Sequence, residues 1–329
     1  MEQPTLNSIT IFALKDFNCK SEIELFQFDE ISFIKGWGEL DSEYFTDDSI
    51  KLIGQLNLMS FANRFFAAVK KDLATLDELS NEHIRLKSKT NHFINCLWFA
   101  KDNSASIINL YTYTLNTNYS LQSVIGPGNS SATGENSPVE FDKEDFDKAL
   151  NIYKAILSVQ TKIESDPPKI DFGGRPIITD SKYHKTNQNK TNRIDRALSF
   201  LFIARNNSFL PLKISLYISV LECLFTKDAG DIVHKISERT AFYVGETPDE
   251  RVDLYRSVKK AYGVRSKFFH GQPLEKNSSE HEVLQNVSLK IDHILRIVLS
   301  KVLLTDYAQF LSNNEQIEEF YTNLIFKKA

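Results

Sequence analysis

Cysteine is scarce in this 329-residue chain, and its three copies show no metal-binding spacing. Cys19, Cys96 and Cys223 are odd in number and far apart in the sequence, which excludes a zinc site built from neighbouring cysteines. Cys223 lies in an apolar run, where a buried thiol is common. The pattern indicates a reducing compartment, and we expect the protein to be cytoplasmic.

Long apolar runs and a signal peptide are also missing. No apolar run reaches ~18 residues without a charge, so the sequence predicts no transmembrane helix and no membrane partner. The amino terminus, Met1-Glu2-Gln3-Pro4, lacks the basic start and the apolar core of a secretory signal.

An excess of positive charge is missing too, since the formal net charge is -4 and the pI is near 6.0. This balance argues against a protein that coats nucleic acid, so any such contact must be local. The composition, 42% hydrophobic and 25% charged, is that of a globular protein. The length predicts about two domains.

The first half of the chain, residues 1–180, reads as a mixed α/β domain. Stretches rich in β-branched and aromatic residues predict strands over residues 8–17, 23–33 and 107–114. Apolar residues spaced three or four apart predict helices over 48–72, over 79–98 and from about 138 onward. The Gly- and Ser-rich residues 125–134 predict a mobile loop, and the polar residues 182–193 a linker.

Histidines of the first half give no metal site. His83 and His92 are nine residues apart, off one helical face, and no carboxylate or cysteine set completes a ligand cluster. We interpret both as surface or capping histidines, and we expect no metal and no cofactor.

The second half, residues 181–329, shows helical periodicity throughout and predicts an all-α bundle of four or five helices. The fold class expected for the whole chain is therefore α+β. Glu222 interrupts the most apolar helix, residues 212–225. It is either an edge position facing solvent or a semi-buried carboxylate that needs a basic partner.

Arg265 and His270 bracket four residues, and Gly271 follows at once. Histidine titrates nearest neutrality and arginine is a natural partner of phosphate, so the two residue types could form a site that holds or cuts RNA. Lys259, Lys260 and other basic residues precede the motif. The alternative is a chance spacing on a solvated helix face.

Four segments between residues 190 and 305 resemble, in order, the Apea-like branch of the HEPN superfamily of helical RNases and nucleotide-binding modules. They are Arg193-Ile-Asp-Arg-Ala-Leu198, Leu221-Glu-Cys-Leu-Phe225, Lys235-Ile-Ser-Glu-Arg239 and Tyr262-Gly-Val-Arg-Ser-Lys-Phe-Phe-His-Gly271. The last segment has the family's arginine, four spacers and histidine.

The resemblance implies an endoribonuclease that needs no metal ion and acts in antiphage defence by abortive infection. Arg265 would hold the phosphate and His270 would move the proton. Supporting or RNA-binding roles would fall to Ser266, Lys267, Lys259, Lys260 and Glu222. The domain of residues 1–180 would then sense a phage-derived or host trigger.

The spacing of the motif also favours a homodimer. Five residues on a helix turn the two side chains roughly 140° apart, so two motifs facing each other across a two-fold axis would make a better site than one. The resemblance implies the same dimer. Gln272 stands where some relatives carry a modified tyrosine, which argues against control by a nucleotidyltransferase. Two alternatives remain open: a non-catalytic module for nucleotide binding, RNA binding or dimerisation, and a DNA-acting or structural protein.

Overall fold

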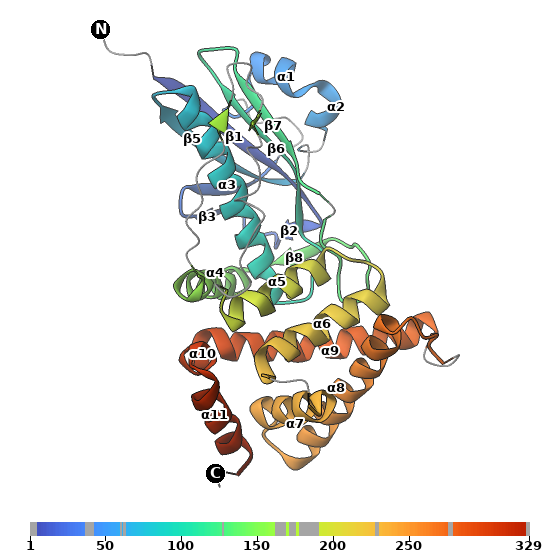
Figure 1. The fold of residues 1–329 in the computed structure, drawn as a ribbon. Helices are drawn as coiled ribbons and strands as arrows, with labels where there is room; N and C mark the ends of the chain where they lie inside the picture. Colours follow the sequence, from blue (N-terminus) through green and yellow to red (C-terminus); the bar gives the residue numbers. More distant parts are fainter. Residues whose placement is uncertain are drawn as a thin grey trace. The chain divides into compact units, whose positions relative to one another are not determined.

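The chain is an α+β protein, with an antiparallel sheet first and helices after it (Figure 1). The computed structural model describes residues 5–36, 43–59, 61, 64–126, 128–161, 169–170, 176–177, 191–227, 230–275 and 279–326. The chain forms two compact units. The sheet unit comprises Met1–Asn129, Ser137–Ala149 and Ser165–Tyr183, and the helical unit comprises Ser130–Asn136, Leu150–Glu164 and His184–Ala329.

The sheet unit is built on six antiparallel strands in the order β3-β4-β5-β1-β6-β7. Their bounds are β1 Leu6–Lys15, β3 Leu25–Phe28, β4 Ile31–Lys35, β5 Phe65–Leu73, β6 Ser106–Thr114 and β7 Ser120–Val124. Two further sheets have two short strands each. One pairs β2 Phe17–Cys19 with β8 Val139–Phe141, and the other pairs β9 Lys169–Ile170 with β10 Pro176–Ile177. The three predicted strand regions are confirmed, and residues 23–33 form the β3–β4 hairpin.

The helix predicted over residues 48–72 is wrong in its second half. Among the described residues of this range, the helical ones are confined to α1 Asp47–Ile53 and α2 Gln55–Leu58, and β5 follows them. Phe65–Val69 is a continuous apolar run, which periodicity alone cannot assign to a strand or a helix. This run pairs with β1 on one side and β4 on the other, and both of its faces are buried. These contacts stabilise it as a strand.

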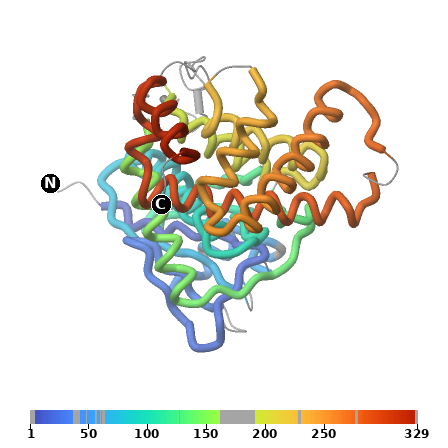
Figure 2. Tube along the Cα trace, turned by 90° about the horizontal axis from the view of Figure 1, so that it is seen from below, coloured from blue at the N-terminus to red at the C-terminus, as the bar shows by residue number. Residues whose placement is uncertain are grey.

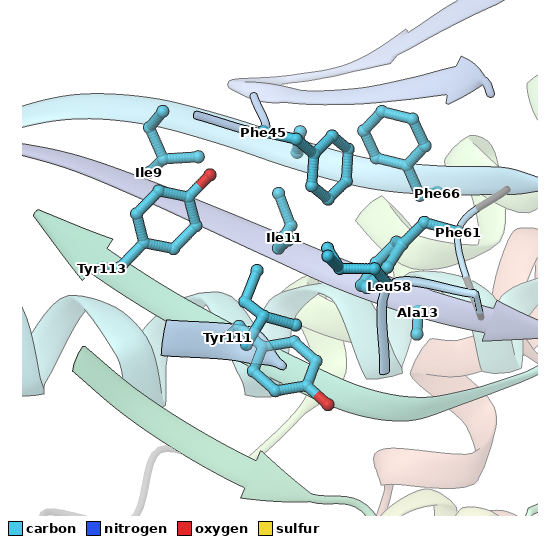
Figure 3. Close-up of a cluster of buried hydrophobic side chains, with 11 residues drawn as sticks. Ile9, Ile11, Ala13, Phe45, Leu58, Phe61, Phe66, Tyr111 and Tyr113 are labelled. Carbon is cyan, nitrogen blue, oxygen red and sulfur yellow. The ribbon is translucent and has the colours of Figure 1, made fainter. Parts of the chain in front are cut away.

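Alternation along β1 divides the two faces of the sheet. Ile9, Ile11 and Ala13 point toward α1 and α2, where they pack with buried residues of β5 and β6 (Figure 3). Ser8 and Thr10, which alternate with Ile9 and Ile11, are buried on the opposite face. Helix α3, Leu76–Cys96, covers that face and matches the helix predicted over residues 79–98.

His83 on α3 is a buried histidine, so its assignment as a surface or capping residue is wrong. Its Nδ1 lies 2.8 Å from Thr112 Oγ1, and its Nε2 lies 2.9 Å from Ser123 Oγ. Thr112 Oγ1 in turn lies 2.9 Å from Thr10 Oγ1. These hydroxyls satisfy both ring nitrogens and make burial of the imidazole possible.

Acid should weaken the sheet unit through this histidine. Burial lowers the pKa of His83 to about 4, against an ordinary value near 6.5. The unfolded chain therefore binds more protons between these values, and stability present above pH 6.5 is lost as the pH falls toward 4. We expect a loss of about 2 kcal/mol in the unfolding free energy between pH 7 and pH 5. Urea titrations at both pH values measure it.

The matched variants are His83→Gln and His293→Gln, since His293 is exposed on a helix of the other unit. The loss on acidification should disappear in the first variant and persist in the second. An equal loss in His83→Gln would remove His83 from this account.

Residues 125–134, predicted as a mobile loop, include a buried stretch where the structure describes them. Asn129, Ser130, Ser131 and Ala132 are all buried. Within the helical unit, the Ser130 amide donates to the carbonyl of Arg205 at 2.7 Å. Gly134 adopts a φ of +80°, where the absence of a side chain is needed. Composition predicted the irregular backbone here and missed its burial.

Helices make up the helical unit. Their bounds are α5 Arg193–Arg205, α6 Leu210–Phe225, α7 Ile232–Val244, α8 Pro248–Phe269, α9 His281–Lys301, α10 Tyr307–Leu311 and α11 Asn314–Phe326, with a π-helical turn at Val302–Asp306. Helix α4, Lys143–Val159, includes residues of both units. It confirms the helix predicted from about 138 but begins later, because Val139–Phe141 pairs with β2 as strand β8. The predicted linker of residues 182–193 lies mostly outside the described residues.

Helix α6 is the centre of the helical unit, and α5, α7, α8 and α9 all pack on it (Figures 1 and 2). Its run from Leu210 to Leu221 is almost wholly buried, as its apolar sequence predicts. Capping boxes start α5 at Asn192 and α8 at Thr247, because each side chain accepts from the third helical amide. Among the described residues, no helix has the length and apolar character needed to cross a bilayer.

Candidate functional site

The carboxyl end of α6 is held by two arginines from neighbouring helices. A helix ends in carbonyls without partners and carries partial negative charge there. The Arg193 guanidinium donates to the carbonyls of Cys223 at 3.0 Å and Thr226 at 2.6 Å. Arg239 donates to the carbonyl of Phe225 at 2.6 Å. These bonds fix the last turn of α6, which carries Glu222.

Glu222 forms an ion pair with Arg265 of α8. The Arg265 Nη2 donates to Glu222 Oε2 at 3.1 Å, and the two side chains are 23% and 18% exposed. The semi-buried carboxylate with a basic partner, one of two readings of Glu222, is thus confirmed. Burial raises the pKa of Glu222, and the Arg265 charge opposes that shift. Within the described residues, Glu222 Oε1 and Arg265 Nε have no hydrogen-bond partner.

His270 ends α8 and is exposed. It is the C-cap residue, its backbone amide donates to the carbonyl of Ser266 at 3.1 Å, and Gly271 follows with a φ of +66°. A glycine in this left-handed conformation just after the last turn is a common way for a helix to end. Arg265 points toward α6, and no hydrogen bond joins it to His270 in the described part of the chain.

Arg265 lines an open hollow of about 840 Å³ formed within the helical unit. Four cationic side chains and one carboxylate line it: Arg193, Arg196, Lys227, Arg265 and Glu222. Phe200 and Phe269 add aromatic rings to its wall. We call this site the basic hollow. Its local positive charge runs against the net charge of -4 of the whole chain.

Other residues predicted to support the motif lie apart from the basic hollow. Lys267 pairs with Glu275 at 2.7 Å, and Ser266 is half-buried on α8. Lys260 lines a separate, smaller hollow with Arg256 and Lys290. The Lys259 ammonium lies 5.9 Å from the ring centre of Tyr255. The structure therefore brings only Glu222 and Arg265 together in one hollow.

Sequence reasoning did not assign Arg193, Arg196 or Lys227 to the site. The first two are one helical turn apart at the start of α5, so they share a face. Lys227 lies five residues after Glu222, just beyond the end of α6. The spacing of the two arginines was a usable signal, but their partner helix was not visible in the sequence.

A thiol also lines the site. Cys223 lines the basic hollow, and burial raises the pKa of its thiol to about 11, so it stays protonated near neutral pH. No group of three or more His, Cys, Asp or Glu side chains among the described residues could hold a metal ion. Comparison with protein-family models, curated proteins and solved structures finds no match for this chain.

Proposed function

We propose that the protein is a metal-independent endoribonuclease whose chemistry lies at Arg265 and His270. The observation that carries the proposal is the end of α8: a guanidinium held by Glu222 in a basic hollow lies five residues before an exposed imidazole. The basic hollow has room for a phosphate beside the Arg265 guanidinium, and the His270 imidazole, which could transfer a proton, is near in the chain. The resemblance of the motif to the Apea-like HEPN domains supports the same assignment.

The proposed reaction is attack of a ribose 2′-oxygen on its own phosphate. The 2′-O–H proton leaves as the new P–O bond forms, and the P–O5′ bond breaks with a proton delivered to the departing oxygen. His270 moves these protons near neutral pH, and Arg265 holds the phosphate oxygens as negative charge develops. Glu222 orients the guanidinium. The products are a 2′,3′-cyclic phosphate and a 5′-hydroxyl, and only RNA has the needed hydroxyl.

Cleavage should survive removal of divalent metals. The purified chain, incubated with total RNA in excess chelator, is expected to cut at the rate measured without chelator, since the proposed groups are side chains. Gel analysis over time measures both rates. Loss of cleavage in chelator, restored by Mg²⁺ or Mn²⁺, would contradict the mechanism.

A symmetric homodimer through the helical unit belongs to the same proposal. In a dimer, one His270 could act as the general base and the other as the general acid. A single imidazole cannot do both at the same time. Like charges at the two motifs repel, so RNA or another anion should steady the pair. Light scattering at low and high salt measures the mass. A monomer that cleaves RNA at full rate would overturn the dimer.

The proposal extends to antiphage defence in the cytoplasm, with the sheet unit as the sensor of a phage-derived or host trigger. The resemblance of the motif to the Apea-like HEPN domains supports this role. Plaque counts on cells expressing the protein, beside a His270→Ala control, test it. Equal protection by the wild type and by His270→Ala would show that defence does not depend on the Arg265–His270 motif.

A non-catalytic RNA-binding or dimerisation module is the second candidate. The ion pair of Arg265 with Glu222 favours it, because a paired guanidinium has less charge to offer a phosphate. In that case RNA binds and stays intact, with or without chelator, and the wild type behaves like His270→Ala.

A further inference from the structure

We infer that the basic hollow binds an unpaired nucleotide of single-stranded RNA, with phosphate held by Arg196 and Lys227 and the base stacked on Phe269. This inference builds on the proposed function, because it names the form of RNA that the site takes and a binding position beside Arg265. It also adds residues outside the Arg265–His270 motif.

Three of the four cations of the hollow have no acidic partner among the described residues, and only Arg265 is paired, with Glu222. Within the described residues, Arg193, Arg196 and Lys227 have no carboxylate at ion-pair distance. Arg193 is occupied with the carbonyls of α6, and one nitrogen of Arg196 donates to the carbonyl of Thr191. Lys227 is exposed and makes no such bond with the described residues. Clustered like charges cost free energy, and an incoming anion such as phosphate turns that cost into attraction.

The aromatic side chains distinguish a nucleotide from a simple anion. Phe269 lines the hollow and is 52% exposed, so part of its ring faces solvent. Phe200 lines the hollow as well. A base that stacks on an aromatic ring gains about 1–3 kcal/mol. Cations beside an exposed ring thus match the phosphate and the base of one nucleotide.

The hollow also indicates that the base is unpaired. Bases in a duplex are stacked inside it, so a ring in a hollow cannot reach their faces, whereas bases in single strands and loops can be splayed out. The volume of about 840 Å³ lies within the range of about 300–1,000 Å³ common for small-molecule sites. The hollow therefore has room for one or two nucleotides but not for an RNA duplex.

Binding of a short 2′-O-methyl RNA, labelled with a fluorophore, tests this position without any dependence on cleavage. Fluorescence anisotropy gives the Kd of the full chain over a salt series. Phe269→Ala should weaken binding about 5- to 100-fold. Lys227→Gln should weaken it several-fold and reduce the slope of log K against log salt by about 0.7. A duplex of the same sequence should compete at least about ten times less well than the single strand.

Matched controls come from the other hollows. Lys290→Gln removes an exposed lysine from the hollow of Lys260, and Phe209→Ala removes an exposed ring that lies on an apolar hollow. Both should bind like the wild type. Wild-type affinity in Phe269→Ala and Lys227→Gln, equal effects in the controls, or no binding at all would overturn the inference. If these two variants weaken binding but the wild type does not cleave all-ribose RNA, the inference stands and only the proposed RNase activity is refuted.

Discussion

Replacing His270 with alanine is expected to abolish RNA cleavage and to leave the fold intact. A positioned general acid or base contributes about 10²–10⁴-fold in rate, so the variant should fall to the background of the assay. His270 is exposed, and its side chain makes no hydrogen bond to another described residue, so the unfolding free energy should change by less than about 0.5 kcal/mol. Initial rates on labelled RNA and urea titrations give the two numbers.

The control is His293→Ala, which removes another exposed histidine of the helical unit. It should cleave at the wild-type rate. Equal rates in His270→Ala and the wild type would take the chemistry away from this residue, however well RNA binds.

Replacing Arg265 with alanine is expected to cost stability as well as activity. The position of Arg265 near a helix end would by itself predict a variant that stays folded. The ion pair changes that expectation, since Glu222 would be left semi-buried without its partner. Loss of a charged partner of this kind costs about 1–3 kcal/mol. The Tm should fall by roughly 2–4 °C for each kcal/mol.

A double-mutant cycle separates the two roles of Arg265. Glu222→Gln removes the charge that needs a partner, so Arg265→Ala in that background should cost less stability than in the wild type. Cleavage should stay lost in both arginine variants. Additive stability effects would show that the ion pair does not matter for folding, and retained cleavage would remove Arg265 from the site.

Local patterns predicted much of this fold. The strands at residues 8–17 and 107–114 and the helix over residues 79–98 follow from neighbours in the sequence. The failures depend on contacts between distant segments. Residues 65–73 became a strand because β1 and β4 lie beside them, and His83 is buried because hydroxyls of β6 and β7 satisfy its nitrogens.

The candidate site shows the same division. A semi-buried Glu222 with a basic partner could be predicted, since a carboxylate in an apolar run needs one. The identity of that partner, 43 residues away, could not. The sequence also could not predict that Arg193, Arg196 and Lys227 gather around this ion pair. These residues come from α5 and from the segment after α6, which meet α8 only in the folded chain.

The ends of the RNA products test the central claim most directly. A single-turnover reaction of the wild-type chain with a short synthetic RNA in chelator, analysed by mass spectrometry, reads the reaction from its products. Attack by the 2′-oxygen predicts a 2′,3′-cyclic phosphate and a 5′-hydroxyl, and no cut next to a ribose replaced by 2′-deoxyribose. Products with a 5′-phosphate and a 3′-hydroxyl, or a cut at the deoxy position, would contradict the assignment of Arg265 and His270 to this chemistry.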